Sequence, residues 1–172
     1  MEPVIEPVTV RALTAADDPG RLRDLRLEML ADAPLAYLER IEDARRHPLS
    51  YWTERVHRYA GGVDRQLYVA EAGNGAWVAQ AGGYLDRSGL AYLVSVYVRP
   101  AHRGRGLLER LAAPVFDWAT ARGSTEIRLE VARENARAVA AYRRLGFVPT
   151  GRSQPHPLYP RRSVEIEMSR PL

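Results

Sequence analysis

The sequence predicts a mixed α/β fold, with a central, mostly antiparallel sheet and helices on both of its faces. Apolar residues repeat with period two in some segments and with period 3.6 in others, and these segments follow one another in the order β α α β β β α β α β β. Strand, helix and strand over residues 91–131 favour a right-handed parallel crossover, whereas the earlier strands are joined by short turns. The 172 residues contain no linker or repeat, so we expect a single domain over residues 1–172.

The N-terminal half is predicted to contain one strand, two helices and a three-stranded meander. Val8–Leu13 alternates as a strand. Apolar residues spaced by three to four predict a helix from Pro19 to just before Ala33–Pro34, and a second from Pro48 to Gly61–Gly62. Turn residues then separate three runs rich in Val, Tyr, Leu and Trp, which we expect to be strands: Gln66–Glu71, Ala76–Asp86 and Ala91–Val98.

The C-terminal half alternates helices and strands. A helix is expected over residues 104–122, ending at Gly123, with Pro114 bending it because proline cannot donate a hydrogen bond to the Arg110 carbonyl. The remaining elements are expected to be a strand, a helix, a short strand, a proline-rich loop and a last strand: Glu126–Val131, Ala136–Leu145, Phe147–Pro149, Arg152–Arg162 and Val164–Ser169.

Composition excludes several classes of function. Cysteine is absent, which removes disulfides, thiolate nucleophiles and Cys-ligated metals, and the four histidines form no metal-binding pair. All 25 basic residues are arginine, but they are spread along the chain without interleaved aromatic residues, so we expect neither a nucleic-acid partner nor a metal. The N-terminus lacks the pattern of a secretion signal, and no apolar run is long enough for a membrane span. We therefore expect a cytoplasmic protein without membrane contact.

The segment from Val96 to Leu108 predicts an anion-binding site. A strand ends at Pro100, a loop with Gly104 and Gly106 follows, and an apolar-periodic helix begins at once. Unsatisfied N–H groups and the positive end of the helix dipole favour phosphate there, although the glycines could serve the turn alone. The phosphate-binding motifs G-x-x-x-x-G-K-[ST] and G-x-G-x-x-G are both absent, as is the nucleophile elbow G-x-S-x-G.

Two motifs in the sequence resemble those of the GCN5-related N-acetyltransferase (GNAT) family. The family's Q/R-x-x-G-x-G/A fits at five positions of Arg103-Gly104-Arg105-Gly106-Leu107-Leu108, with Leu108 in place of Gly or Ala. The family's second segment matches at Leu129, Val131, Asn135, Ala138, Tyr142, Gly146 and Phe147. The resemblance implies a GNAT-like acyl-CoA N-acyltransferase fold, with acetyl-CoA as the cosubstrate and no metal.

The resemblance also implies roles for individual residues. The backbone of Val96, Tyr97 and Val98 would pair with the pantetheine arm, which Asn135 would also bind. The diphosphate would lie on the main-chain amides from Gly104 to Glu109, next to Arg103. The residues that bind the diphosphate would thus be Arg103, Gly104, Arg105, Gly106, Leu107, Leu108 and Glu109. Tyr142 would protonate the departing thiolate.

Each assignment of a catalytic role has an alternative. Glu130 is the candidate base, because it lies five residues before Asn135, as does the catalytic Glu of the family's ribosomal-protein alanine acetyltransferases. It could equally be a solvent-facing strand carboxylate, Asn135 a simple N-cap and Tyr142 a core residue. Other candidate bases are Ser95, Tyr97 and His156.

The resemblance implies direct attack of a primary amine on acetyl-CoA in a ternary complex. The acceptor would be a small molecule or a peptide N-terminus, bound by the loops Ala33–Tyr37 and Ser153–Tyr159. A non-catalytic sensor of acyl-CoA on the same fold is the alternative. An exposed sheet edge would also allow a homodimer.

Overall fold

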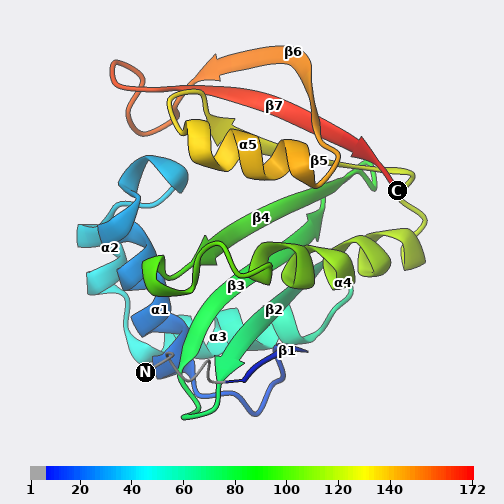
Figure 1. The fold of residues 1–172 in the computed structure, drawn as a ribbon. Coiled ribbons are helices and arrows are strands. Elements are labelled where there is room, and N and C mark those ends of the chain that lie inside the picture. Colours follow the sequence, from blue (N-terminus) through cyan, green and yellow to red (C-terminus); the bar gives the residue numbers. More distant parts are fainter. Residues whose placement is uncertain (1–6) are drawn as a thin grey trace, which may run out of the picture.

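A computed structural model describes residues 7–172 and contains a seven-stranded sheet. The strands are β1 (Val8–Ala12), β2 (Arg65–Ala72), β3 (Trp77–Leu85), β4 (Ala91–Val98), β5 (Glu126–Ala132), β6 (Val148–Pro155) and β7 (Val164–Pro171). They lie in the order β1-β2-β3-β4-β5-β7-β6 (Figure 1). Residues 1–6, for which the sequence predicts no secretion signal, lie outside the described part.

The predicted mixed sheet is confirmed, with one parallel pair among antiparallel ones. The parallel pair, β4 and β5, is short: Ala91 pairs with Ile127 and Tyr92 with Arg128, and the two strands then diverge. Beyond Tyr92, β4 stays paired with β3 on its other side as far as Val98. The sheet therefore opens between its two middle strands, and the β5-facing edge of β4 is left without a strand partner.

Helices cover both faces of the sheet, as expected. They are α1 (Pro19–Asp32), α2 (Ile41–Arg46), α3 (Leu49–Ala60), α4 (Leu107–Ala121) and α5 (Ala136–Arg144), with short 3₁₀ turns η1 (Pro34–Ala36) and η2 (Pro100–His102). Helices α4 and α5 pack on one face, and α1, α2 and α3 pack on the other (Figure 1).

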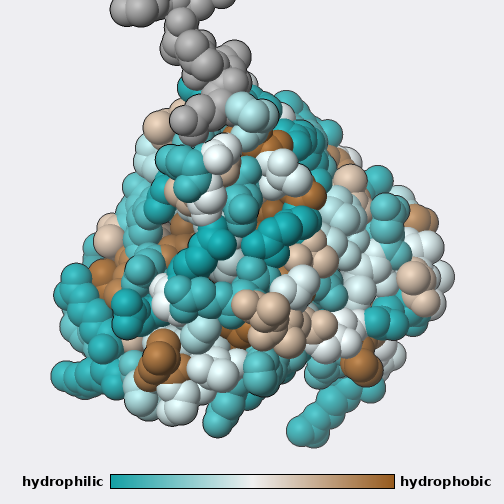
Figure 2. Space-filling model, turned by 90° about the horizontal axis from the view of Figure 1, so that it is seen from below, coloured by the Kyte–Doolittle hydropathy of each residue, from teal (hydrophilic) through white to brown (hydrophobic). Residues whose placement is uncertain are grey.

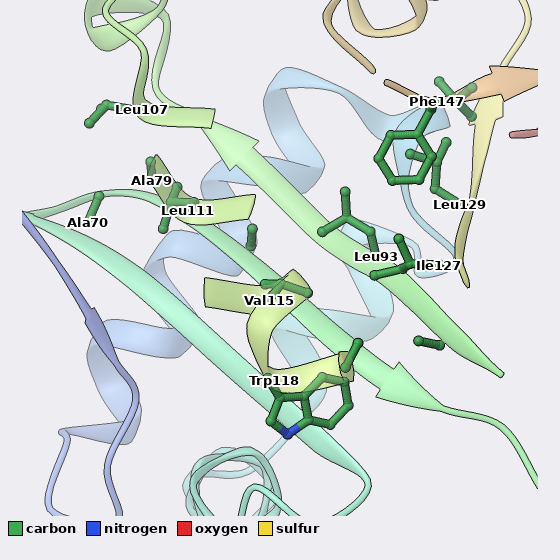
Figure 3. Packing of buried hydrophobic residues seen from close by; sticks show 14 of the residues in the cluster. Ala70, Ala79, Leu93, Leu107, Leu111, Val115, Trp118, Ile127, Leu129 and Phe147 are labelled. Atoms are coloured by element: carbon green, nitrogen blue, oxygen red, sulfur yellow. The ribbon is translucent and has the colours of Figure 1, made fainter. Parts of the chain in front are cut away.

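The amphipathic side of α4 provides much of the core on its face of the sheet. Leu107, Leu111, Val115 and Trp118 point from the helix onto the strands (Figure 3). Gly83 of β3 lies directly beneath the indole of Trp118, whose Nε1 donates a hydrogen bond to the Gly62 carbonyl. This packing holds the start of α4 at the end of β4, where the sheet opens.

Most of the predicted elements are confirmed, and two predictions are wrong. The segment between the first two helices contains the additional helix α2, which has six residues and is too short to show a helical period. The predicted loop Arg152–Arg162 begins inside β6, which continues to Pro155. Every residue of β6 is exposed, so no apolar alternation marks it, and only its pairing with β7 defines it. Helix α4 continues unbroken through Pro114.

The surface is mainly polar. Figure 2 shows apolar residues in separate spots among hydrophilic ones on the face seen from below. Within residues 7–172, no helix is long and apolar enough to cross a membrane.

Candidate active site

A cavity of about 710 Å³ occupies the opening between β4 and β5. On the α4–α5 face it is lined by Leu107, Ala138 and Tyr142, and on the opposite face by Tyr37 and Glu130. Because one cavity is lined from both faces, it passes through the sheet where the two strands diverge. Two ligands can thus enter from opposite sides and meet in the gap.

One end of the cavity is a cradle of main-chain amides at the start of α4. Gly104 and Gly106 adopt left-handed conformations, with φ of 72° and 70°. Within the described residues, no acceptor takes a hydrogen bond from the amides of residues 104 to 109. A Cβ at either glycine would meet no atom within 4 Å, so the space in front of the loop is open. The cradle suits a phosphate group.

The side chains of this loop divide into three groups. Leu107, Leu108 and Glu109 all line the cavity, and Leu107 is also buried in the core beneath the loop. Arg105 is exposed and does not line the cavity. Its guanidinium contributes charge only from the outer surface of the loop.

Arg103 fastens the loop to the rest of the protein. Its Nε donates to the Val98 carbonyl at 2.9 Å, and its Nη2 lies 2.5 Å from Asp32 Oδ2 at the end of α1. The guanidinium also lies over the Tyr97 ring, 5.9 Å from its centroid. Since Asp32 offsets part of its charge, Arg103 serves to position the amide cradle as well as to attract an anion.

Side chains hydrogen-bond to the backbone of β4 next to its unpaired edge. Ser95 has a φ of 54°, and its carbonyl accepts a hydrogen bond from Gln80 Nε2 at 3.1 Å. The Tyr37 hydroxyl, from the segment after η1, donates to the Val96 carbonyl at 2.8 Å. The sequence placed Tyr37 in an acceptor loop, but no sequence signal links residues 59 positions apart.

Two predicted site residues come from α5. Asn135 caps this helix, with Oδ1 accepting from the Ala138 amide at 3.1 Å, and it also lines the cavity. Tyr142 lines the cavity too, and its ring packs at 6.1 Å against Phe147. Burial raises the pKa of the Tyr142 hydroxyl, so that it stays protonated and can donate a proton.

Glu130 lies on the other side of the gap, among further carboxylates. Its loss of hydration, followed by the charges of Glu165 and Glu167, raises the pKa of its carboxyl group. The amide of Gln154 donates to Glu130 Oε1 at 3.2 Å and to Glu165 Oε2 at 3.3 Å. A carboxylate with a raised pKa, facing a cavity, is suited to accept a proton.

The other candidate bases are placed differently. Ser95 lines the cavity. The Tyr97 hydroxyl is directed at Glu28 of α1, at 3.3 Å, and burial, followed by the Glu28 charge, raises its pKa. His156 is fully buried and is absent from the cavity lining, so the structure does not support its proposed contact with an acceptor.

The structure separates the two loops that the resemblance named as acceptor loops. Ala33, Ala36 and Tyr37 of the first loop line the cavity. No residue of Ser153–Tyr159 lines it, because this segment packs outside the cavity, where Arg40 donates to the Leu158 carbonyl at 3.4 Å and lies over the Tyr159 ring at 5.4 Å. The structure therefore does not support a direct acceptor contact by the second loop.

Comparisons with known proteins agree with this architecture. Residues 27–147 match the model of the Acetyltransferase (GNAT) family. The streptothricin acetyltransferase of Streptomyces lavendulae is 43% identical over 56 residues, which cover 33% of this chain and 30% of the relative. The N-alpha-acetyltransferase RimI of Mycobacterium tuberculosis is 31% identical over 152 residues, covering 85% of this chain and 82% of the relative.

Solved structures share the whole fold. A GNAT-family acetyltransferase from Streptococcus pneumoniae has a TM-score of 0.80 at 18% identity, covering 96% of this chain and 99% of that one. A phosphinothricin acetyltransferase from Sinorhizobium meliloti, in complex with AcCoA, has a TM-score of 0.77 at 22% identity, covering 96% and 88%. The chain covers less than half of the first curated relatives that it matches.

Proposed function

The chain belongs to the GNAT family of acetyltransferases, and we propose that it transfers the acetyl group of acetyl-CoA to a primary amine by direct attack in a ternary complex. The observation that carries this proposal is the cavity through the sheet, with a cradle of unpartnered amides at one end and carboxylates at the other. The polyanionic acetyl donor needs N–H groups and positive charge, whereas the ammonium group of the acceptor needs negative charge. The two ends of the cavity supply these separately.

The chain's residues fit the cosubstrate. The diphosphate binds the amides from Gly104 to Glu109, whose N–H groups have no other partner in the described part of the chain. The pantetheine arm adds to the edge of β4 that β5 leaves at Val96–Val98, as an extended ligand adds to a strand, beside the hydrogen bonds that Tyr37 and Arg103 donate to the Val96 and Val98 carbonyls. The free Nδ2 of Asn135 donates to the same arm, while Oδ1 caps α5.

The reaction needs three proton movements. Glu130 takes the first proton from the acceptor ammonium, and the neutral nitrogen attacks the thioester carbonyl carbon. As the carbon–sulfur bond breaks, the Tyr142 hydroxyl gives its proton to the sulfur, and the nitrogen, on becoming an amide, releases its second proton, which restores the tyrosine hydroxyl. Glu130 and Tyr142 line the same cavity from opposite faces of the sheet, so the base and the acid can both face a thioester bound in the cavity.

The acceptor is a small-molecule amine or a peptide N-terminus. Relatives are named for both kinds: a streptothricin acetyltransferase and an aminoglycoside N(6')-acetyltransferase for the first, an N-alpha-acetyltransferase for the second. Of the two loops implied by the resemblance, only Ala33–Tyr37 lines the cavity.

Calorimetry and a thiol-release assay test this function. Acetyl-CoA and CoA are titrated into the purified protein, and binding is expected for both. No heat from either ligand at millimolar concentration would refute the assignment. Release of free CoA thiol is then followed with a panel of amines. Binding without thiol release for any amine would point instead to a sensor of acyl-CoA.

A further inference from the structure

The charges that line the cavity are unevenly distributed: apart from Glu109 in the first turn of α4, the carboxylates and most of the arginines lie in different halves. Arg103, Arg137 and Arg144 line it from the loop before α4 and from α5, together with the amide cradle. Glu130 and Glu165 line it from β5 and β7, on the other side of the gap. The half that receives the acceptor is therefore the acidic half.

Two arginines also reach the acceptor half, and neither pairs with these two carboxylates. Arg26 is bound to Glu39 at 2.7 Å, and its guanidinium lies over the Tyr37 ring. Arg65 lies over the Tyr84 ring, 5.9 Å from the centroid, with its Nε 3.9 Å from Asp64. Neither arginine is therefore available to pair with Glu130 or Glu165.

In the described part of the chain neither carboxylate has an arginine partner, although the chain has 25 arginines. Several other carboxylates next to the sheet are paired: Glu28 with Arg99 at 2.8 Å, Glu71 with Arg11 at 3.1 Å and Glu167 with Arg128 at 3.5 Å. Among residues 7–172, no arginine reaches salt-bridge distance of Glu130 or Glu165, and the two share the amide of Gln154. Glu165 is buried, whereas Glu130 is exposed at the cavity. A buried carboxylate normally has a cationic partner, so a cation from outside the chain would complete the site at Glu165.

A buried imidazole supports Glu165 from behind. His156 is fully buried, and its Nδ1 accepts from the amides of Leu158 and Tyr159. The hydrogen of the neutral ring therefore lies on Nε2, which has no hydrogen-bond partner within the described chain. This nitrogen faces Glu165 Oε1 at 3.9 Å, and Glu165, unlike His156, lines the cavity. His156 thus lies behind a carboxylate that lines the cavity, without a hydrogen bond to it.

Aromatic rings face the same space. Tyr84 of β3 and Tyr92 of β4 are stacked, with centroids 5.0 Å apart and planes 10° from parallel, and both line the cavity. Burial, followed by the neighbouring Tyr92 and the Glu130 charge, raises the pKa of the Tyr84 hydroxyl, and Glu130 lines the same cavity. Aromatic faces beside carboxylates are a typical environment for alkylammonium groups.

We infer that the acceptor is a small amine with a second positively charged group, which Glu165 binds while the first amine is acetylated. The inference rests on the proposed function and names its substrate class. One carboxylate of the pair, Glu130, accepts the proton of the reacting ammonium, and the other, Glu165, binds the second group. Because one amide hydrogen-bonds to both carboxylates, the two nitrogens of the acceptor lie a few bonds apart.

A matched pair of amines tests the inference. The values of kcat/KM are measured for 1,4-diaminobutane and for 1-aminobutane, which differ in the second ammonium group. The wild-type enzyme is expected to prefer the diamine by roughly 10- to 100-fold, the range of a hydrogen bond between charged groups. Glu165→Gln keeps the size of the side chain and is expected to reduce this ratio to near one. Glu42→Gln, an exposed residue of α2 outside the cavity, is the control and should keep the wild-type ratio.

The possible failures are distinguishable. If the protein does not bind acetyl-CoA, the proposed function itself fails. If it binds acetyl-CoA but acetylates no diamine, only the inferred acceptor class is overturned. The same holds if it acetylates 1-aminobutane, or a peptide whose only amine is its N-terminus, as well as it acetylates the diamine. A diamine preference that survives Glu165→Gln, in a variant with wild-type affinity for acetyl-CoA, overturns the role of Glu165.

Discussion

Replacing Tyr142 by phenylalanine isolates the proton donor from the packing around it. The variant loses one oxygen atom, and in the described chain the hydroxyl has no hydrogen-bond partner. The ring keeps its contact with Phe147, so the free energy of unfolding should change by less than about 0.5 kcal/mol. The affinity for acetyl-CoA should also be retained, because no proposed contact with the cosubstrate uses the hydroxyl.

The expected loss is in turnover. General acid catalysis contributes roughly 10²- to 10⁴-fold. An alkyl thiol, with a pKa of about 8.5, leaves more readily than an alcohol, so we expect the lower end, about 100-fold in kcat, or about 2.7 kcal/mol of transition-state free energy. Thiol release at saturating acetyl-CoA measures kcat, calorimetry measures affinity and thermal melting measures stability.

A matched control makes the result decisive. Tyr68→Phe removes the same atom from a half-buried tyrosine of β2 that does not line the cavity, and its kcat should equal that of the wild type. An unchanged kcat in Tyr142→Phe would refute the assignment of this tyrosine as the acid. A loss of acetyl-CoA affinity would show that the hydroxyl binds the ground state instead.

Three further substitutions test the site and the core. Glu130→Gln should abolish the acidic limb of the pH–rate profile, which in the wild type lies above the ordinary glutamate pKa because folding raises the pKa of Glu130. Because folding disfavours the ionised carboxylate, the variant should also melt slightly higher than the wild type at pH 8. Below about pH 4 the carboxyl is protonated in the folded and the unfolded states, so the two melting temperatures should agree. A normal acidic limb in this variant would exclude Glu130 as the base. Asn135→Ser keeps an N-cap oxygen and should preserve stability while weakening acetyl-CoA binding, whereas Asn135→Ala should in addition cost about 1 kcal/mol of stability; wild-type affinity in the serine variant would leave only the capping role. Gly83→Ala would place a Cβ 2.7 Å from Trp118 Cζ3 and should destabilise the fold by about 1–3 kcal/mol, measured by urea unfolding, and an unchanged midpoint would contradict the packing described.

Local sequence patterns predicted much of the fold because most elements carry their own signal. The run Ala91–Val98 was predicted with its observed bounds, and α1 begins at the expected Pro19, where Asp18 accepts a hydrogen bond from the Gly20 amide. Helix α2 and the second half of β6 escaped prediction for the opposite reason. The first is shorter than two helical turns, and the second has no buried side to produce a period.

The amide cradle could be read from the sequence because it depends on contiguous residues. Two glycines between a strand and an apolar-periodic helix are enough to predict positive φ angles and unsatisfied N–H groups, and both are present at Gly104 and Gly106. The other half of the cavity depends on residues far apart in the chain. Glu130 meets Gln154 only through the order in which β5, β7 and β6 pair, and Tyr37 reaches Val96 only because α1 packs beneath β4.

Sequence alone thus determined the elements, the family resemblance and the phosphate-binding end, since helix starts, turns and amphipathic periods are properties of neighbouring residues. The tertiary structure decided which side chains share the cavity: it fastened Arg103 to Asp32, placed His156 behind Glu165 rather than in the site, and left two carboxylates without arginine partners. Such arrangements follow from strand order and packing, because the charge environment of a group is set by neighbours in space that the chain brings together only on folding.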